Sequence, residues 1–379
     1  MSKSEKSVKE WNDRVVQEKL KIYDKKTIEK AEEILSIAPQ PITMFKSERS
    51  AGGIHDFYSE GDYWWPDPEN PDGPYLRKDG LTNPENFVAH RKAMRNLNEW
   101  VATLVAAFKL SGDEKYAAHA VRHLSAFFLD QDTYMSPHLL YAQAIKGRYT
   151  GRGIGIIDTI HLIEVAKAIE VLLGMGYLEE PEEGGLKEWF MAYATWMNSH
   201  PYGLKEKDHG NNHSTWWAAQ IAAFGNLLEN EDLKIEAKNK FKKLLATQMD
   251  SLGRFPDEIE RTKPFNYTLF NLEGYATICH LLSNEHENLW QYTTPNGTLE
   301  NAWKYMIPYL KDKSRWPHQK DVSHFDELPI QSVGLLLSAM AYESDVLLEI
   351  WQGLSPEKPS EEIKRNYPYW QPVLWVKLL

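Results

Sequence analysis

One stretch near the middle of the chain gathers side chains that could do chemistry. It runs from His209 to Trp217, reads HGNNHSTWW, and leads into an apolar segment at 218–228 that favours a helix. Asn211 or Asn212 is suited to cap that helix, because an asparagine side chain accepts a hydrogen bond from the first turn. The N–H groups and the positive dipole end of such a helix favour an anion. We interpret this anion as the carboxylate of an acidic sugar.

A second stretch, 251–268, brings charged and phenolic groups into what we predict to be a loop. Arg261 offers a planar pair of donors that suits a carboxylate, and Tyr267 offers a phenol. With the first stretch, these groups match the three tasks of uronate β-elimination. The carboxylate must be neutralised, the proton next to it removed, and the departing glycosidic oxygen protonated. We assign Asn212, Asn211 and Arg261 to the first task, His213 to the second and Tyr267 to the third.

Each of these residues also has an ordinary structural explanation. His213 can be a capping or core histidine, the asparagines can be simple caps, and Tyr267 can be a core aromatic residue. Arg261 can pair with a neighbouring glutamate at the surface. His209 and His213 are four residues apart, as zinc ligands on a helix are, but the expected helix begins between them and no His-Glu-x-x-His pattern is present. We therefore expect no metal and no other cofactor.

The segment 42–83 is rich in proline and glycine, which exclude long regular elements, yet it carries many aromatic and charged side chains. A long loop of this kind is more often functional than idle, and the alternative is a plug over one end of the domain. We predict that this loop is functional.

Two further places could line a binding cleft. The segment 134–158 interrupts the helical period, and its glycines and arginines suit either close approach to a ligand or a plain turn between helices. Another loop, 315–324, precedes the last helices. From these places we expect Gln143, Arg152 and His318 to contact the substrate.

Most of the chain has the apolar periodicity of helices. One or two amphipathic helices are expected in 1–37, and from Pro84 onward apolar residues recur every three or four positions. Ser111 and Gly112 mark the end of one helix, and Asp113 caps the next. Strand signals are scarce and no fixed-period repeat is visible. We predict an all-α fold, an incomplete α/α toroid or barrel of antiparallel helical hairpins, in a single domain spanning 1–379. Further helical stretches are expected at 156–174, 186–199, 213–229, 231–249, 270–284, 299–311 and 330–351.

Composition and charge restrict the class of protein. With 379 residues, 42% of them hydrophobic and 26% charged, the chain can bury a sizeable core. A net charge of -11 argues against nucleic-acid binding, and it requires basic residues to gather in the cleft if the substrate is a polyanion. We expect no nucleic-acid partner and no membrane partner. The polar start lacks a signal-peptide core, so we expect a periplasmic or secreted location if a signal peptide has been removed and a cytoplasmic one otherwise.

Several segments, taken in order, resemble the alginate-lyase superfamily of polysaccharide lyases. The likeness extends from about residue 52 to residue 337. It implies an α/α toroid with a deep cleft and metal-independent elimination. It also implies that Asn212 and Arg261 bind the carboxylate, that His213 and Tyr267 form the base and acid pair, and that the loop at 54–78 is a lid with sugar-contacting aromatic rings. On the basis of this resemblance we expect a lid-like loop at about 50–80 in which Tyr63, Trp64 and Trp65 contact the substrate. The segments are GDYWWPDP at 61–68, YAQAI at 141–145, NNHS at 211–214, and GRFP at 253–256 followed by Arg261 and Tyr267.

Two features differ from the best-known alginate lyases. The segment 261–267 reads RTKPFNY and lacks the tyrosine- and histidine-rich run expected there. The pair Trp64–Trp65 is typical of a divergent branch that takes glucuronan or mixed uronans. The predicted function is therefore that of a polysaccharide lyase acting on an acidic uronate polysaccharide, which can be alginate, polymannuronate or glucuronan.

The stereochemistry at the sugar C5 decides how the two proton transfers are divided. If the C5 hydrogen and the leaving oxygen are syn, Tyr267 can perform both transfers while His213 assists. If they are anti, His213 is the base and Tyr267 is the acid. Mannuronate and guluronate differ at C5, so both assignments stay open at this point.

Two other kinds of protein fit parts of the pattern. A glycoside hydrolase on a similar helical scaffold would need two opposed carboxylates. A non-catalytic glycan-binding protein would use Trp64, Trp65 and Trp216 as stacking platforms. The acidic residues available to a hydrolase are Asp56, Asp62, Asp158, Asp257 and Glu258.

Overall fold

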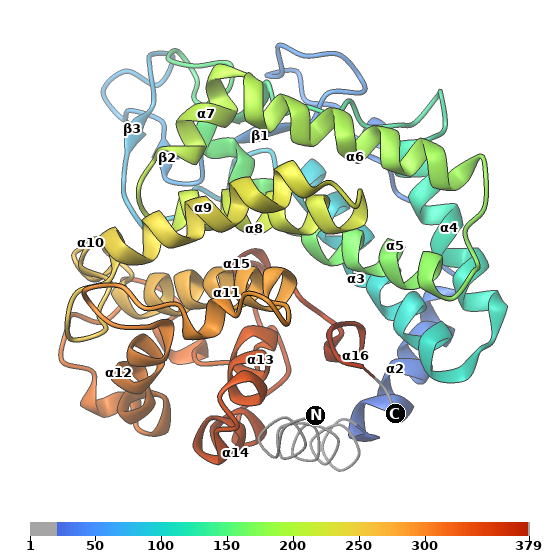
Figure 1. Ribbon diagram of the computed structural model, residues 1–379. Coiled ribbons are helices and arrows are strands. Elements are labelled where there is room, and N and C mark those ends of the chain that lie inside the picture. The colour runs from blue at the N-terminus through green and yellow to red at the C-terminus, as the bar shows by residue number, and fades with distance from the viewer. Residues whose placement is uncertain (1–20, 378–379) are drawn as a thin grey trace.

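The computed structural model describes residues 21–377, and within that range the chain is built almost entirely from helices (Figure 1). The longer helices are α2 (Lys21–Ile34), α3 (Ala89–Ser111), α4 (Glu114–Phe128), α5 (Leu162–Gly174), α6 (Glu182–Ser199), α8 (Asn212–Leu227), α9 (Glu231–Gln248), α11 (Pro264–Leu282) and α12 (Leu299–Lys311). The shorter ones are α7 (Pro201–Lys207), α10 (Pro256–Ile259), α13 (Val333–Ala341), α14 (Asp345–Gly353), α15 (Glu361–Asn366) and α16 (Pro372–Trp375). Single turns of 3₁₀ helix are η2 (Ile42–Met44), η4 (Leu289–Gln291), η5 (Lys313–Arg315) and η6 (Phe325–Glu327), and η3 (Gly153–Thr159) is longer.

The helices form an open ring of hairpins. Going around it, α3 packs against α5, α5 against α8, α8 against α11, and α11 against α13, while α4, α9 and α14 cover α3, α8 and α13 from outside. The inner helices α8 and α11 are buried along almost their whole length, and α9 is lysine-rich with one exposed face. Within residues 21–377, α13 makes no comparable packing with α3, so the ring stays open. The prediction of an all-α, incomplete α/α toroid is confirmed.

Several predicted helix ends are confirmed. Gly112 ends α3 in the left-handed conformation (φ 71°), and Asp113 caps α4 by accepting a hydrogen bond from the Lys115 N–H. Asn211 caps α8, with its side chain accepting from the His213 N–H. Of the one or two helices expected in 1–37, α2 is observed, and residues 1–20 lie outside the described range. The prediction of one domain over 1–379 includes those residues and stays a prediction.

Two predicted elements differ from the structure. The stretch 251–268 was expected to be a loop, but it contains α10 and the first turn of α11, because Pro256 and Pro264 each occupy the first turn of a helix, where no N–H is needed. The stretch 330–351 was expected to be one helix, but it breaks into α13 and α14 at a turn where Glu343 has a positive φ of 48°. Tyr267 therefore lies on a helix and not in a loop.

The strands are short and lie in the predicted lid-like region and its neighbour. β1 (Tyr58–Glu60) pairs in parallel with β4 (Tyr141–Ala144), and β2 (Trp64–Trp65) pairs antiparallel with β3 (Leu76–Arg77). The first pairing ties the segment 50–80 to β4, and the second folds that segment back on itself. The pairings thereby fix the backbone at Gln143 and next to Tyr63.

The C-terminal segment runs back across the ring and packs on its body, as predicted. The backbone N–H groups of Trp370 and Gln371 donate to the buried carboxylate of Glu164 on α5, and so does the indole of Trp375. The helix α15, which precedes this anchor, lies near α8 and α11 in Figure 1, and its Arg365 bonds Asp62 and Tyr63 of the 50–80 segment. None of the helices between residues 21 and 377 combines the length and the apolarity needed to cross a membrane.

Candidate active site

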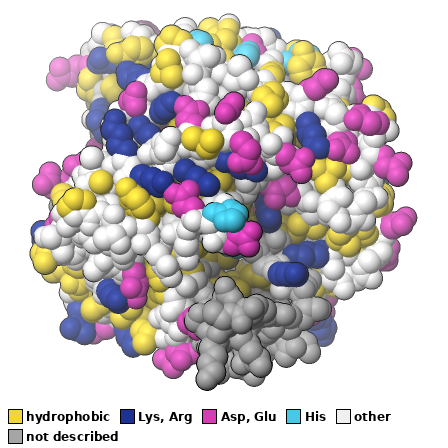
Figure 2. Space-filling model, in the orientation of Figure 1, with side chains coloured by type: hydrophobic (Ala, Val, Ile, Leu, Met, Phe, Trp, Pro, Cys, Tyr) yellow, Lys and Arg dark blue, Asp and Glu magenta, His cyan; other side chains and the backbone are white. Residues whose placement is uncertain are grey.

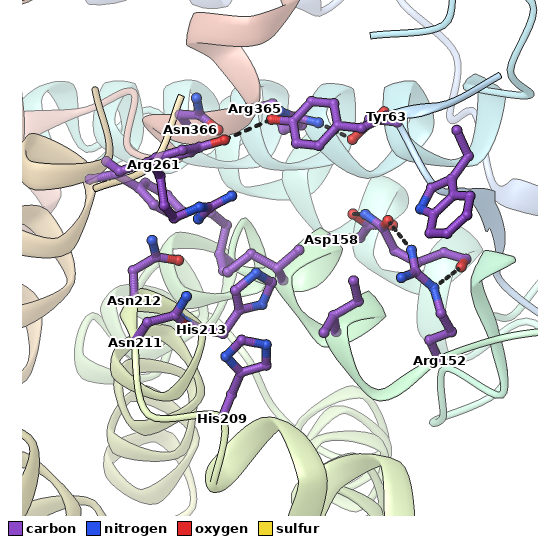
Figure 3. A pocket seen from close by; sticks show the side chains of 18 of the residues that line it. Tyr63, Arg152, Asp158, His209, Asn211, Asn212, His213, Arg261, Arg365 and Asn366 are labelled. Carbon is purple, nitrogen blue, oxygen red and sulfur yellow. Dashed lines mark hydrogen bonds and ion pairs between the residues drawn. The ribbon is translucent and has the colours of Figure 1, made fainter. Parts of the chain in front are cut away.

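A cavity of about 400 Å³ opens at the end of the ring where α8 and α11 begin. Figure 3 shows Arg152 on one side of it and Arg261 with Asn212 on the other. The lining comes from the 50–80 segment, β4, η3, α7, α8, α11 and α15. Of the predicted site residues, the cavity brings together Tyr63, Trp64, Gln143, Arg152, Asn211, Asn212, His213, Arg261 and Tyr267.

The start of α8 is held by a protein carboxylate. The backbone N–H of Asn212 donates to Oε1 of Glu258 (2.8 Å) and its side-chain amide donates to Oε2 (2.6 Å). Glu258 is 1% exposed, and burial raises the pKa of its carboxyl. The sequence predicted that a sugar carboxylate would sit on the N–H groups of this helix. That expectation is wrong for the first N–H, because Glu258 already occupies it.

Arg261 is a partly buried residue of the cavity wall, with its side chain 23% exposed. Its guanidinium lies 3.8 Å above the ring of Tyr267, and its closest approach to Glu258 is also 3.8 Å. Within residues 21–377 the guanidinium makes no hydrogen bond to another side chain or carbonyl, so its planar donors are available to a ligand. The carbonyl of Arg261 accepts a hydrogen bond from Gln319, which fixes the loop before α11.

His213 is paired with a residue that the sequence did not single out. Its Nδ1 lies 2.7 Å from Oε1 of Glu206, a side chain that is 0% exposed on α7. The ring stacks on His209 at 4.8 Å, and burial, followed by repulsion from His213, lowers the pKa of His209 to about 4. The two histidines therefore face each other as stacked rings. Within residues 21–377, no group of three or more His, Cys, Asp or Glu side chains is arranged to hold a metal ion.

Tyr267 belongs to a pair of phenols. Its hydroxyl lies 3.1 Å from that of Tyr63, which in turn accepts a hydrogen bond from Arg365 at 3.3 Å. Burial raises the pKa of Tyr267 to about 12, although Arg261 and the bond from Tyr63 act in the opposite direction. The Tyr267 hydroxyl is therefore protonated at neutral pH and can donate a proton. Arg365 and Asn366, from α15, also line the cavity, and no signal in the sequence indicated this.

The opposite wall is made from Trp64, Arg152 and Gln143. The Arg152 guanidinium lies 5.9 Å from the Trp64 ring and donates to the backbone carbonyl of Gln143 at 2.7 Å. Burial lowers the pKa of Arg152 to about 10, so it keeps its charge at neutral pH. Gln143 adopts a positive φ of 56°, and its side chain bonds both Arg152 and Asp158. A ring with adjacent cationic and amide groups can contact both the face and the carboxylate of a uronate.

Two predicted contact residues lie outside the cavity. The Trp65 indole N–H donates to the carbonyl of Leu81, on the face of β2 opposite to Trp64. His318 lies among aromatic side chains, with its Nε2 2.8 Å from the hydroxyl of Tyr305. Trp216, the third platform of the glycan-binding alternative, is 0% exposed in the core. These three side chains are therefore not placed to contact a ligand in the cavity.

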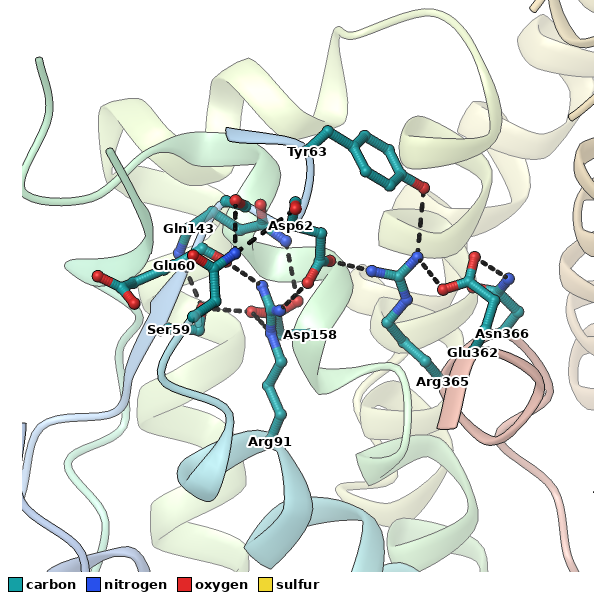
Figure 4. A network of polar contacts seen from close by, with 12 residues as sticks. Ser59, Glu60, Asp62, Tyr63, Arg91, Gln143, Asp158, Glu362, Arg365 and Asn366 are labelled. Carbon is teal, nitrogen blue, oxygen red and sulfur yellow. Dashed lines mark hydrogen bonds and ion pairs between the residues drawn. The ribbon is translucent and has the colours of Figure 1, made fainter. Parts of the chain in front are cut away.

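The acidic side chains of the cavity are engaged by arginines. Arg91 donates from Nε to Asp158 (2.9 Å), from one terminal nitrogen to Asp62 (2.5 Å) and from the other to the carbonyl of Glu60 (2.8 Å). Asp62 is also bonded by Arg365, and Asp158 by Ser59 (Figure 4). Neither carboxylate is left free to act as a general acid or base.

The charge of the lining is opposite to that of the molecule. The chain carries a net charge of -11, and Figure 2 shows acidic side chains spread over the visible face. In the cavity, the acidic Asp62 and Asp158 are both ion-paired with Arg91, and Asp62 is also paired with Arg365. The requirement that basic residues gather in the cleft is therefore met. The basic side chains of the lining are Arg77, Arg152, Lys205, Arg261 and Arg365.

Comparisons with known proteins agree with this geometry. The family model for alginate lyase matches residues 42–316. A crystal structure of an alginate lyase from Bacteroides ovatus is 30% identical, covers 96% of this chain and 96% of that one, and superposes with a TM-score of 0.81. Alginate lyase A1-III from Sphingomonas species A1 shares the fold at 13% identity, with 84% of this chain and 88% of that one covered and a TM-score of 0.54. No curated protein sequence matches the chain.

The family match includes the start of α8, Arg261 and Tyr267, and it ends before α15. The structural match to the Bacteroides ovatus enzyme extends over nearly the whole chain. The resemblance recognised in the sequence is thereby confirmed: the chain belongs to the alginate lyase family and is a polysaccharide lyase.

Proposed function

We propose that this lyase cleaves a uronate polysaccharide by β-elimination, using side chains alone and no metal ion. The C5 proton of the uronate is removed, the bond between C4 and the glycosidic oxygen breaks, and a C4–C5 double bond forms. The leaving oxygen takes up a proton. The products are one new chain end and one unsaturated uronate end.

One observation carries the proposal. Arg261, Asn212, His213 and Tyr267 come from separate parts of the chain, and all four line one basic cavity. Among the residues that the structure describes, Arg261 has unused donors, and one hydrogen of the Asn212 amide has no partner once Glu258 has taken the other. A carboxylate bound there is neutralised as negative charge develops in the enolate-like transition state.

The environments of Tyr267 and His213 indicate which of them donates a proton and which accepts one. The buried Tyr267 is protonated at neutral pH, since its pKa is raised to about 12, and this suits the acid that protonates the leaving oxygen. His213 has one ring nitrogen bound to Glu206, and we assign the other as the base. This division corresponds to the anti alternative, in which base and acid act from opposite faces of the sugar ring.

The carboxylates of the cavity argue against hydrolysis as a second activity of this site. Hydrolysis needs one carboxyl that donates a proton and one that attacks or activates water. Asp62 and Asp158 are both ion-paired to Arg91, and Glu258 is bonded by Asn212. Asp257 is exposed, and Asp56 contacts His138 and the Gly53 N–H.

We further propose that neighbouring sugars contact Trp64, Arg152 and Gln143, and that the 50–80 segment is the lid over the cleft. Variants of alginate lyase A1-III with a histidine changed to alanine, and with a tyrosine changed to phenylalanine, are each complexed with tetrasaccharide in solved structures. An oligosaccharide of this kind is a suitable ligand for the corresponding experiments on this chain. Alginate, polymannuronate and glucuronan are the substrates to compare.

The test measures ultraviolet absorbance of the unsaturated uronate product while the protein is mixed with polymannuronate, polyguluronate and glucuronan separately, with and without a chelator. We expect absorbance to rise with at least one polymer and to be unchanged by the chelator. The polymer that reacts identifies the geometry at C5. New reducing ends without absorbance would replace elimination by hydrolysis, and loss of activity with the chelator would contradict the metal-free mechanism.

A further inference from the structure

Glu206 is a carboxylate buried next to the proposed base. It lies near the end of α7, is 0% exposed, and its Oε1 is 2.7 Å from Nδ1 of His213. Its Oε2 is buried and has no hydrogen-bond partner within residues 21–377. An ionised carboxylate left with a single partner is costly in a protein interior, so this arrangement is unlike an ordinary structural ion pair.

The backbone around this pair is fixed. Ser214 donates from its hydroxyl to the carbonyl of Glu206 (3.0 Å) and accepts from the Gly210 N–H (2.8 Å). The N–H of His213 donates to the side chain of Asn211 at 3.1 Å. These bonds hold α7 and the start of α8 in one relative position. The imidazole is therefore presented to the cavity at a set orientation, with Glu206 behind it.

We propose that Glu206 is a positioning residue, which holds His213 in the tautomer that carries its proton on Nδ1 and leaves Nε2 unprotonated toward the cavity. A carboxylate can only accept a hydrogen bond, so an ionised Glu206 requires the proton on Nδ1. Nε2 then keeps its lone pair for the C5 proton, and the resulting imidazolium is stabilised by the adjacent negative charge. This inference rests on the proposed function.

Other charged groups near His213 do not take over this role. His209 stacks on the ring and is neutral at physiological pH, because its pKa is lowered to about 4 by burial and by His213. Glu258 is bonded to Asn212 and lies near Arg261. Tyr193 on α6 lies close enough to Glu206 to feel its charge, although burial is the main cause of its raised pKa. Asp158 and Lys205 line the same cavity as His213, and Lys207 is ion-paired with Glu236.

The first test is the variant Glu206→Gln. Its amide can donate to Nδ1, which moves the ring proton to Nε2 and turns the base into a donor. We expect kcat to fall about 100- to 10,000-fold with KM changed less than about threefold. Glu206→Asp, which keeps the carboxylate, should recover part of the lost kcat.

A matched control is Glu236 on α9, which pairs with the same helix α7. Glu236 is ion-paired with Lys207, the last residue of α7, and does not contact His213. Glu236→Gln should therefore loosen α7 to a similar degree and leave kcat within about twofold of the wild type. A loss in Glu236→Gln equal to that in Glu206→Gln would assign the effect to helix packing and overturn the proposal.

A second measurement uses the unmodified chain, so that it does not depend on a variant folding. Nitrogen-15 NMR of the histidine rings identifies which nitrogen of His213 carries the proton, with His213→Ala assigning the signals. A proton on Nδ1 supports the proposal, and one on Nε2 overturns it. The proposed function and the proposed role of Glu206 can also be tested separately. Full activity in His213→Ala contradicts the proposed function, whereas an inactive His213→Ala with a fully active Glu206→Gln contradicts only the role of Glu206.

Discussion

Arg91 and Arg261 lie close to the same cavity and are held in opposite ways. Arg91 is 3% exposed and uses its guanidinium nitrogens on Asp158, Asp62 and the carbonyl of Glu60. Arg261 stacks on an aromatic ring and has only a long contact with Glu258. The first arginine is satisfied by the protein, and the second keeps its donors for a ligand.

The difference shows how to recognise a ligand-binding arginine. Neither residue type nor position near the cavity distinguishes Arg91 from Arg261, because both arginines have other basic residues and carboxylates nearby. What separates them is the number of donors that the protein itself has already used. The same criterion separates the buried acids: Asp62 and Asp158 hold Arg91 in place, whereas Glu206 and Glu258 orient residues that face the cavity.

The largest expected effect comes from the proton-transfer groups on the Arg261 side. His213→Ala and Tyr267→Phe should each lower kcat by about 1,000- to 10,000-fold, because each removes the group that accepts or donates a proton in the reaction. The circular dichroism spectrum and thermal midpoint should stay close to those of the wild type. Near-normal turnover in either variant would remove that residue from the mechanism.

Arg261→Met should lower kcat about 100- to 1,000-fold, because the developing charge on the substrate carboxylate loses its planar donors. The free energy of unfolding should fall by only about 1 kcal/mol, since the cation–π contact and one long ion pair are lost. Steady-state kinetics and urea unfolding of the same preparation measure both effects. A loss of stability without a loss of kcat would place Arg261 in the same class as Arg91.

Arg91→Met should show the reverse of Arg261→Met, with a large loss of stability and a smaller loss of kcat. It leaves Asp62 and Asp158 buried without their main partner, and we expect the free energy of unfolding to fall by about 3–5 kcal/mol. Urea denaturation followed by fluorescence measures this directly, and the thermal midpoint should fall with it. A variant as stable as the wild type would show that the network in Figure 4 does not hold the 50–80 segment to the ring.

The pH dependence tests which group is the base. With His213 as base, kcat/KM should not follow the ionisation of Tyr267, which then acts only as a proton donor. Tyr267, with its pKa raised to about 12, stays protonated over the accessible range and contributes no fall below about pH 10. With Tyr267 as base, kcat/KM would instead continue to rise toward alkaline pH. A profile from pH 5 to 10 separates the two.

Sequence reasoning succeeded where the signal was local. The Asn211 cap, the ends of α3 and α4, and the alternation of buried and exposed helices all follow from neighbouring residues. The likeness to a known family supplied the order of Asn212, His213, Arg261 and Tyr267 along the chain, and these side chains share one cavity.

The partners behind those residues could not be predicted in the same way. Glu206 and Glu258 sit in charged segments that look like solvated turns, and only tertiary packing buries them against His213 and Asn212. Arg365 comes from a helix far along the chain, whose position depends on the anchoring of the tail to Glu164. A one-dimensional pattern carries no information about such pairings.

The smallest expected effect is that of substitutions at Trp64 and Trp65, which also allow a second comparison. The two tryptophans are adjacent in β2, so their side chains point to opposite faces, and only Trp64 lines the cavity. Trp64→Ala should raise KM about 2- to 10-fold with little change in kcat, because it removes one stacking surface for a sugar ring. Trp65→Ala is the matched control: it removes a ring that bonds Leu81 and should leave KM within about twofold. KM could instead rise more for Trp65→Ala than for Trp64→Ala, with both thermal midpoints unchanged. That result would mean that substrate contacts the outer face of the 50–80 segment and that neighbouring sugars do not bind in the cavity.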